Sequence, residues 1–220
     1  MNGLRKAGFQ KLKAVPGFTL VELLVVIAIM GILLALIAPA VMPLLRSVNI
    51  NKAATMLGDE LNTDRQLALT QNRDVEVRFY RVGSKTNAND LQFRAFRAFS
   101  TSGTSSIKAP LSAVKYLPEP VIFSGTATYS TLLDNSVQPA KDSLTQGKET
   151  LQGVGLIDYV SFLFRATGGT NLTPVTGNGS NWYLTFFLEN APINPVTGIP
   201  SNYVTAQIDP VTGRLRTYRP

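Results

Sequence analysis

The longest apolar stretch of the chain runs from Leu23 to Leu45 and contains no charged residue. A helix of about 20 predominantly apolar residues crosses the hydrocarbon core of a bilayer, and this stretch is long enough to do so. We therefore expect one membrane-spanning helix near the amino terminus. Pro39 and Pro43 lie inside it. Because each proline removes a helical hydrogen bond and clashes with the preceding turn, we expect a kink or local unwinding there.

Beyond this stretch the apolar residues keep a helical spacing, which predicts that residues 46–72 continue the helix with one buried face. Asp64 and Arg65 interrupt the apolar stripe in its second half, and we expect the helix to end near Asn72. The stripe consists of Ile50, Ala54, Leu57, Leu61 and Ala68. One half of the long helix would lie in lipid, and the other half would pack against the rest of the chain.

Residues 73–220 follow a different pattern, in which apolar and polar residues alternate with the period of a β-strand. Segments 75–81 and 91–99 both alternate and are separated by a polar connection, which predicts a hairpin. Further strands are expected at 114–117, 121–123, 159–165, 182–189, 203–208 and 214–218. These patterns together predict an α+β fold, with a long amino-terminal helix packed against an antiparallel β-sheet head.

Two features interrupt the run of strands. Residues 124–153 are rich in Ser, Thr, Gln and Gly with little periodicity, so we predict a long surface excursion with a short helix near Ser130–Asp134. The sequence Pro-Val-Thr-Gly begins at Pro174, Pro195 and Pro210. Proline presets the first turn angle and glycine accepts a positive φ, so each copy predicts a turn. The third copy would join the last two strands as a hairpin.

Enzymatic chemistry finds little support in the composition. The chain has no cysteine and no histidine, which excludes disulfides, thiol catalysis, histidine-based triads and zinc sites of the usual ligands. Carboxylates are scattered, and Asp74 and Glu76 would share a solvated strand face, while Arg78, Arg94 and Arg97 would line an exposed face of the sheet. No glycine-rich phosphate loop or acidic calcium loop is present. A two-carboxylate glycosidase site is the enzymatic alternative left open; we expect no catalytic residue, cofactor or metal.

Much of the net charge of +7 lies at the amino terminus. Residues 1–17 contain no acid and carry the cations Arg5, Lys6, Lys11 and Lys13. Cations that flank a membrane helix stay in the cytoplasm, so we expect a cytoplasmic amino terminus and an exported head. An ordinary secretory signal cleaved after Ala38-Pro39-Ala40 is the alternative, although Glu22 within the apolar segment and the central proline argue against it.

One acidic residue, Glu22, opens the apolar run, in the sequence Gly17-Phe-Thr-Leu-Val-Glu22. A carboxylate inside a membrane helix costs roughly 2.5–3.5 kcal/mol on insertion scales, so we expect it to have a partner. The short basic leader, the Gly17–Phe18 junction and a glutamate five positions beyond that junction closely resemble the processing site of type IV pilins and type II secretion pseudopilins.

This resemblance implies that residues 1–17 are a leader, which a prepilin peptidase removes between Gly17 and Phe18 before it methylates the new amino group of Phe18. Residues 18–45 would then form the transmembrane and assembly helix. In it, the Glu22 carboxylate would pair with the Phe18 ammonium of a neighbouring subunit. The alternative role for Glu22 is that of a helix-start residue at the level of the lipid headgroups.

The resemblance also implies partners and a location. The partners would be other pilin or pseudopilin subunits and an inner-membrane assembly platform. The chain would cross the bacterial inner membrane once, with residues 73–220 in the periplasm, and would then enter a filament in which the helix loosens near Pro39. The head resembles the H-type minor pseudopilins and related minor pilins; that resemblance is carried by residues 64–69, 75–78 and 208–216.

A basic carboxyl terminus is the remaining candidate site. Arg214, Arg216 and Arg219 lie near Tyr218, and Arg214 and Arg216 would project from one face of the final strand. Gly213-Arg-Leu-Arg216 resembles the Gly-Arg-x-Arg element of minor pilins that bind DNA during natural transformation. The arginines would contact phosphates and Tyr218 would stack on a base. A solvated hairpin end without a nucleic-acid partner is the alternative.

Overall fold

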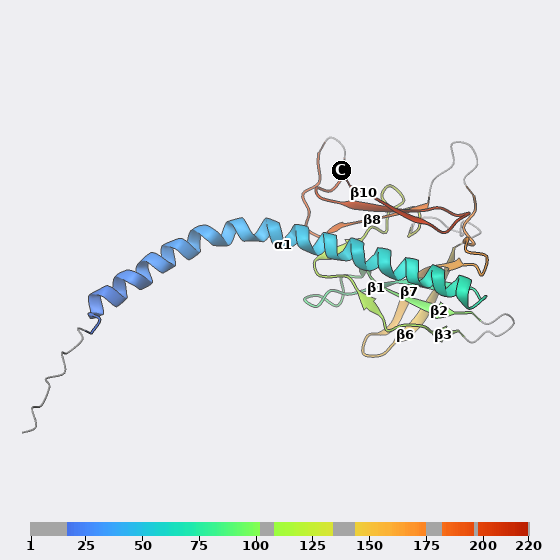
Figure 1. Ribbon diagram of the computed structural model, residues 1–220, viewed down its shortest axis with the longest axis horizontal. Coiled ribbons are helices and arrows are strands. Elements are labelled where there is room, and N and C mark those ends of the chain that lie inside the picture. The colour runs from blue at the N-terminus through green and yellow to red at the C-terminus, as the bar shows by residue number, and fades with distance from the viewer. Residues whose placement is uncertain (1–16, 102–107, 134–143, 175–181, 196–197, 220) are drawn as a thin grey trace, which may run out of the picture. The chain divides into compact units, whose positions relative to one another are not determined.

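One long helix and ten strands make up the part of the chain that the computed structural model describes (Figure 1). The described residues are 17–101, 108–133, 144–174, 182–195 and 198–219, and the side chains of residues 37–46 are outside the description. Residues 1–43 and 44–220 form two units, and each is considered by itself below.

The first unit contains the start of helix α1, which begins at Leu20 and ends at Thr70. The described part from Leu20 to Leu36 is almost entirely apolar, and its side chains are exposed. No helix in the described part of the chain is both long enough and apolar enough to cross a membrane. The helix is assigned without interruption through Pro39 and Pro43, whose side chains lie outside the described residues, so the kink expected there stays a prediction.

In the second unit, α1 presents its predicted apolar stripe to the sheet. Ile50, Leu57 and Leu61 are buried, as are Ala54 and Ala68, which confirms the stripe. The helix ends close to the predicted position, because Asn72 adopts a left-handed conformation with φ 47°. The Arg73 N–H then donates to the Ala68 carbonyl at 3.2 Å, a contact that satisfies one of the last free carbonyls of the helix.

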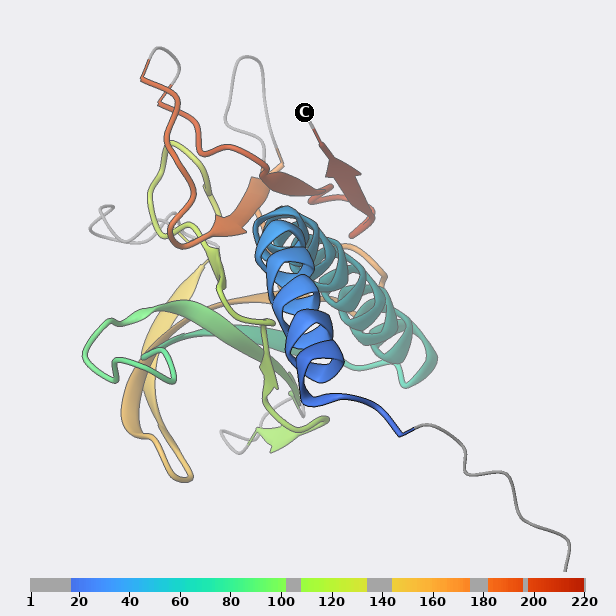
Figure 2. The same ribbon diagram turned by 90° about the vertical axis from the view of Figure 1, so that its left-hand side faces the viewer.

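The strands form one antiparallel sheet in the order β10-β9-β8-β5-β2-β1-β7-β6, with the short strands β3 and β4 also paired to β2. Figures 1 and 2 show that the sheet curves, so that its β8–β10 end and its β1–β7 end lie on different sides of the head segment of α1. The bounds are β1 Val75–Val82, β2 Gln92–Ser100, β3 Ala109–Pro110, β4 Lys115–Tyr116, β5 Val121–Phe123, β6 Thr145–Leu151, β7 Gly155–Phe164, β8 Trp182–Leu188, β9 Val204–Ile208 and β10 Leu215–Tyr218.

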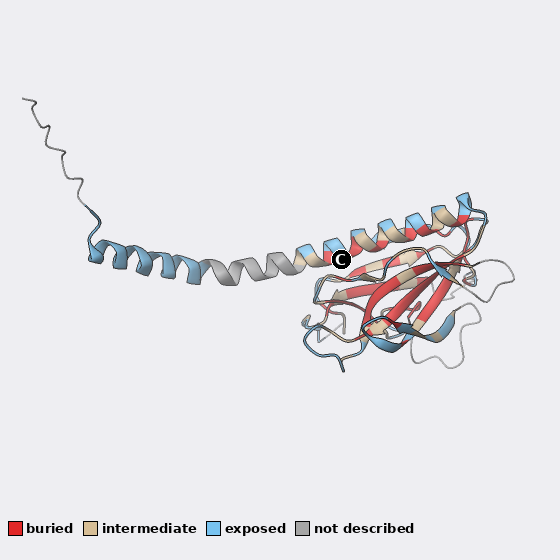
Figure 3. Cartoon of the chain, turned by 90° about the horizontal axis from the view of Figure 1, so that it is seen from below, coloured by how far each residue is buried: buried red, intermediate tan, exposed pale blue. Residues whose placement is uncertain are grey.

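An aromatic cluster fills the space between the sheet and the helix. Phe79 on β1 is fully buried and lies 5.5 Å from the ring of Phe123 and 6.0 Å from that of Phe96, measured between ring centroids. Burying one such side chain contributes about 1.5–3 kcal/mol. Figure 3 shows the buried residues concentrated on the strands and on the face of α1 that is turned toward them. The α+β architecture predicted from the sequence is therefore confirmed.

In the described parts of residues 124–153, two segments differ from the surface excursion that the composition suggested. Thr145–Leu151 forms β6, which pairs along its whole length with β7. Ser130 to Leu133 are buried rather than helical, and the Ser130 hydroxyl accepts a bond from the Thr185 N–H of β8 at 3.0 Å. Residues 134–143, which include the end of the predicted short helix, lie outside the described residues.

The second face of the sheet is also covered, so the prediction of an exposed arginine face was wrong for Arg78 and Arg94. The Arg78 guanidinium pairs with Glu76 at 3.0 Å and with Glu149 of β6 at 2.8 Å. Arg94 pairs with Asp90 at 2.7 Å and with Glu189. Period-two alternation shows which residues share a face, but it does not show that Glu149 of β6, which lies beyond β7 in the sheet, reaches Arg78.

The predicted solvated pair on β1 is wrong for the same reason. Glu76 is 1% exposed, because Arg78, Lys108 and the Ser161 hydroxyl all contact its carboxylate. These partners hold the pKa of the Glu76 carboxyl below its usual range despite the opposing effect of burial. Asp74 instead accepts a bond from the Ala166 N–H at 2.9 Å and so ties the start of β1 to the end of β7.

Candidate functional site

The predicted processing and assembly residues lie where α1 begins. Thr19 directly precedes the first helical residue, and its N–H and hydroxyl donate to Oε2 of Glu22 at 2.9 and 2.8 Å. The Glu22 N–H returns a bond to the Thr19 hydroxyl at 3.2 Å. This reciprocal pattern at a spacing of three residues is a capping box, which satisfies two backbone N–H groups that the helix start leaves free.

One oxygen of Glu22 is left over by this arrangement. Both bonds from Thr19 reach Oε2, and Oε1 has no hydrogen-bond partner among the described residues. Phe18, the residue before Thr19, has 85% of its surface exposed. Gly17 has no neighbour within 4 Å of where a Cβ would sit, so packing within the described chain does not require a glycine there. Within the described chain, this segment is therefore exposed apart from the contacts between Thr19 and Glu22.

The basic carboxyl terminus is built on the turn between β9 and β10. Asp209 and the third Pro-Val-Thr-Gly copy form that turn, as predicted, with Gly213 at φ 64°. The Asp209 carboxylate accepts bonds from the N–H groups of Val211 and Thr212 at 2.9 and 3.2 Å. The bond from Thr212, ahead of the smaller effect of Val211, lowers the pKa of the Asp209 carboxyl.

Helix α1 holds this turn in place through Arg65. The Arg65 Nε donates to the carbonyls of Gly168 at 3.0 Å and Thr212 at 2.7 Å. A Cβ on Gly213 would come within 2.6 Å of the Gly168 carbonyl oxygen, so both the left-handed backbone and the close approach require glycine. The terminal hairpin is therefore a fixed part of the head.

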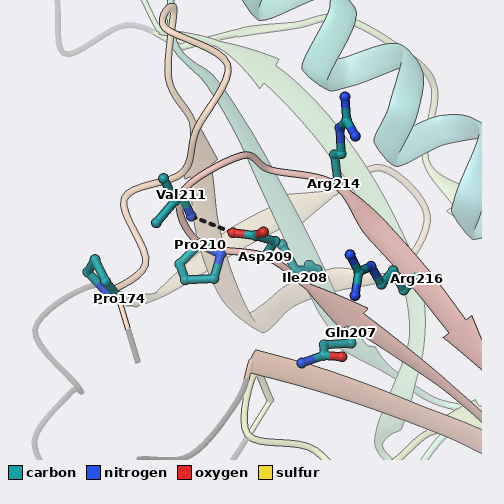
Figure 4. Close-up of a pocket in the computed structure, with 8 residues that line it drawn as sticks. All are labelled: Pro174, Gln207, Ile208, Asp209, Pro210, Val211, Arg214 and Arg216. Atoms are coloured by element: carbon teal, nitrogen blue, oxygen red, sulfur yellow. Dashed lines mark hydrogen bonds between the residues drawn. The ribbon is translucent and has the colours of Figure 1, made fainter. Parts of the chain in front are cut away.

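Two of the three predicted arginines lie together. Arg214 and Arg216 line one shallow pocket of about 270 Å³, which also includes Asp209 and Val211 (Figure 4). Arg214 precedes the first residue of β10, and Arg216 is the second residue of that strand. Arg219 is exposed and is not part of the pocket lining. Tyr218 is 48% exposed at the end of β10.

A buried carboxyl lies on the face of α1 that packs against the head. Asp64 is 2% exposed, and its Oδ2 has no hydrogen-bond partner among the described residues. Burial, reinforced by the nearby Glu60 carboxylate and opposed by Lys115, raises the pKa of Asp64 to about 7. The side chain that interrupted the apolar stripe in the sequence therefore lies inside the head. No group of three or more acidic side chains is placed to hold a metal ion in the described part of the chain.

Sequence reasoning missed Thr19 and Arg65. The Thr19–Glu22 spacing is the signature of a capping box and was available in the sequence. The only signal for Arg65 was its place in the apolar stripe, which gave no indication of its partners.

Comparison with known proteins agrees with the amino-terminal motif. The family model described as the prokaryotic N-terminal methylation motif matches residues 13–38. This match confirms that the segment containing Gly17, Phe18 and Glu22 is a prokaryotic N-terminal methylation motif. No curated protein matches the chain.

Two solved structures are similar to the chain at low identity. The minor pseudopilin EpsH from the type 2 secretion system of Vibrio cholerae has 11% identity and a TM-score of 0.41, and the match covers 78% of this chain and 98% of EpsH. The type IV minor pilin FimU of Pseudomonas aeruginosa has 14% identity and a TM-score of 0.38, with 78% of this chain and 92% of FimU covered.

Proposed function

We propose that the chain is a structural, non-enzymatic subunit, a minor pseudopilin or minor pilin, of a type II secretion or type IV pilus-like filament. The observation that carries this proposal is the methylation motif over residues 13–38, which contains the Gly17–Phe18 junction and Glu22. The head architecture is compatible with this role, since a helix backed by a sheet can present loops and edges to other subunits.

In this proposal a prepilin peptidase cleaves between Gly17 and Phe18 on the cytoplasmic side of the inner membrane and methylates Phe18. Residues 18–45 anchor the subunit in the membrane with the head in the periplasm. The exposed apolar side chains from Leu20 to Leu36 support this step, because an apolar surface of this extent requires lipid or other helices to cover it.

Assembly then joins the helices of successive subunits. An assembly platform, driven by a cytoplasmic ATPase, extracts the subunit, and its helix packs in a heterologous array that does not close. The Phe18 ammonium of one subunit pairs with Glu22 of the next, since an unpaired carboxylate in a low-dielectric medium is strongly disfavoured. The free Oε1 supports this step, because a cation can bind there while Oε2 still caps the helix.

Three variants test this role for Glu22. In Glu22→Ala, leader removal should continue while incorporation into filaments falls at least about tenfold, as measured by immunoblotting of sheared or purified filaments. Asp59→Ala removes an exposed acid elsewhere on α1 and should incorporate normally. Thr19→Ala disrupts the cap but keeps the carboxylate, and it should incorporate far better than Glu22→Ala. Equal defects in Thr19→Ala and Glu22→Ala would favour the helix-start role and contradict the charge pair.

DNA binding is the alternative function, and it depends on Arg214, Arg216 and Arg219. Its structural support is that Arg214 and Arg216 line one pocket. The double variant Arg214→Ala with Arg216→Ala provides the test. Unchanged binding of the purified protein to DNA in this variant would remove the DNA-uptake function.

A further inference from the structure

The arginines at the carboxyl terminus differ from every other arginine whose side chain the structure describes. Each of the others donates a guanidinium hydrogen bond to a carboxylate, a side-chain amide or a backbone carbonyl. Within the described residues, the guanidinium groups of Arg214, Arg216 and Arg219 make no hydrogen bond and no ion pair. Three arginines with unused donors therefore follow one another within residues 214–219, and two of them, Arg214 and Arg216, line one pocket.

The same place is an open edge of the sheet. Strand β10 pairs with β9 on one side, and no other described strand pairs with it. Arg216, Thr217 and Tyr218 are exposed. An edge strand presents a row of backbone N–H and C=O groups that a further strand can bind.

The arginines also share one face at this open edge. Arg214 and Arg216 are two positions apart, and alternate residues of an extended chain share a face. Both line the same pocket of about 270 Å³. The one carboxylate in that lining, on Asp209, accepts both N–H bonds of its own turn at Oδ1. The bond from the Thr212 N–H and, less strongly, the charge of Arg216 lower the pKa of Asp209, but neither arginine forms a hydrogen bond or ion pair with it among the described residues. The guanidinium donors are thus left for a ligand.

The edge is also held rigidly before any partner arrives. Arg65 fixes the turn through the Thr212 carbonyl. The Thr170 hydroxyl and N–H both donate to the Pro210 carbonyl, at 2.9 and 3.0 Å. Leu215 packs beside Gly58 of α1. A preformed edge loses little conformational entropy when a partner binds.

We propose that β10 is a docking edge for an extended acidic segment of another protein, which adds as a further strand and places carboxylates at alternating positions against Arg214 and Arg216. Arginine binds carboxylates in a bidentate manner, so the recognised pattern is acid–any residue–acid. The free backbone edge favours a polypeptide over a nucleic acid, because only a polypeptide can use both the edge and the arginines. This inference goes beyond the proposed function and does not depend on processing at Gly17.

The opposite edge of the sheet supplies a matched control. Strand β6 is also an edge strand, but its exposed cation, Lys148, already pairs with Asp158 at 3.4 Å. The full-length protein in detergent micelles is titrated against a fluorescein-labelled peptide in which glutamate and valine alternate, with binding followed by fluorescence anisotropy. Arg214→Ala with Arg216→Ala should weaken binding at least about tenfold, whereas Lys148→Ala should leave it unchanged. Equal loss in the two proteins, or no binding to the wild type, would overturn the proposal.

Modified peptides test the mode of binding on the wild-type protein, so the result does not depend on how a variant folds. A glutamine–valine peptide should bind at least about tenfold more weakly. In an extended strand, alternate residues turn their backbone groups to opposite edges. Hence N-methylation at the glutamates and N-methylation at the valines should have unequal effects, with one abolishing binding. Equal effects of the two N-methylations would overturn strand addition. Binding of a single-stranded oligonucleotide through the arginines, without binding of the acidic peptide, would indicate nucleic-acid recognition instead.

Discussion

The amino-terminal unit and the head use their apolar residues in opposite ways. From Leu20 to Leu36 the apolar side chains are exposed, and the local contacts are those of the capping box. In the head, the apolar residues of α1 and the sheet are buried against one another around Phe79. The apolar side chains from Leu20 to Leu36 therefore form no buried core within the described chain, whereas the head is stabilised by its own contacts.

Truncation of the core should give the largest difference between the two regions. Phe79→Ala removes the ring that contacts Phe96, Phe123 and Phe162, and we expect a loss of about 3–5 kcal/mol in the free energy of unfolding. The exposed Leu33→Ala in the first unit should leave that free energy unchanged. Fluorescence of Trp182, the chain's one tryptophan, which is buried in the head, can follow denaturation of the full-length protein in detergent. Equal losses of unfolding free energy in Phe79→Ala and Leu33→Ala would contradict this difference between the two regions.

The buried Asp64 should make the stability of the head depend on pH. Its pKa is raised from 3.8 to about 7 in the folded chain, so the folded state keeps a proton that the unfolded state has already lost. Stability should therefore fall as pH rises from about 4 to about 7, by about 1.4 kcal/mol per pH unit at most. Between pH 5 and pH 8 the free energy of unfolding should drop by about 3 kcal/mol more in the wild type than in Asp64→Asn. The same pH slope in both proteins would show that another group is responsible.

The anchor of the terminal hairpin should have a smaller and more local effect. Arg65→Ala removes the one Nε–H donor that is shared between the Gly168 and Thr212 carbonyls, and a hydrogen bond from a charged donor is worth about 1.5–3 kcal/mol. Amides of β9 and β10 should then exchange with deuterium faster, while those of β1 and β2 are little changed. Arg81→Ala removes one longer bond, at 3.3 Å to the Leu91 carbonyl, and serves as the control. Unaltered exchange in β10 of the Arg65 variant would contradict the anchoring role.

Loss of the cap should give the smallest effect, confined to the first unit. Thr19→Ala removes the capping box, at a cost of about 0.5–2 kcal/mol. Amide exchange in the first turn of α1 should accelerate while the head keeps its protection. Thr63→Ala, which removes an exposed hydroxyl bonded to the Asp59 carbonyl, is the matched change within the head segment of α1. Exchange in the first turn that is as fast in Thr63→Ala as in Thr19→Ala would be inconsistent with the cap.

The sequence predicted those features whose cause is local. The β1–β2 hairpin, the β9–β10 hairpin and the apolar stripe of α1 follow from residues a few positions apart, and so does the motif from Gly17 to Glu22. Strand β6 was missed because Thr145-Gln-Gly-Lys-Glu-Thr-Leu151 has no apolar alternation and is held by pairing to β7.

Contacts between residues that are far apart in the sequence could not be predicted from local patterns. Arg65 and Thr212 are 147 positions apart, and Arg78 and Glu149 are 71 apart. Asp64 and Arg65 looked like interruptions of the apolar stripe, because polar residues on a buried face require partners. No sequence pattern identified such partners. The arginines of the terminal hairpin were visible in the sequence, but their unused donors and the open edge beside them were not.

Our proposal depends first on processing that exposes the amine of Phe18, which we propose then pairs with the Glu22 carboxylate of a neighbouring subunit. Intact-mass and amino-terminal peptide mass spectrometry of the protein extracted from its native membrane tests this claim most directly. We predict a mature chain that begins at Phe18 with a methylated amino group. A chain that keeps residues 1–17, that begins at Val41, or that begins at Phe18 without the methyl group would contradict the account.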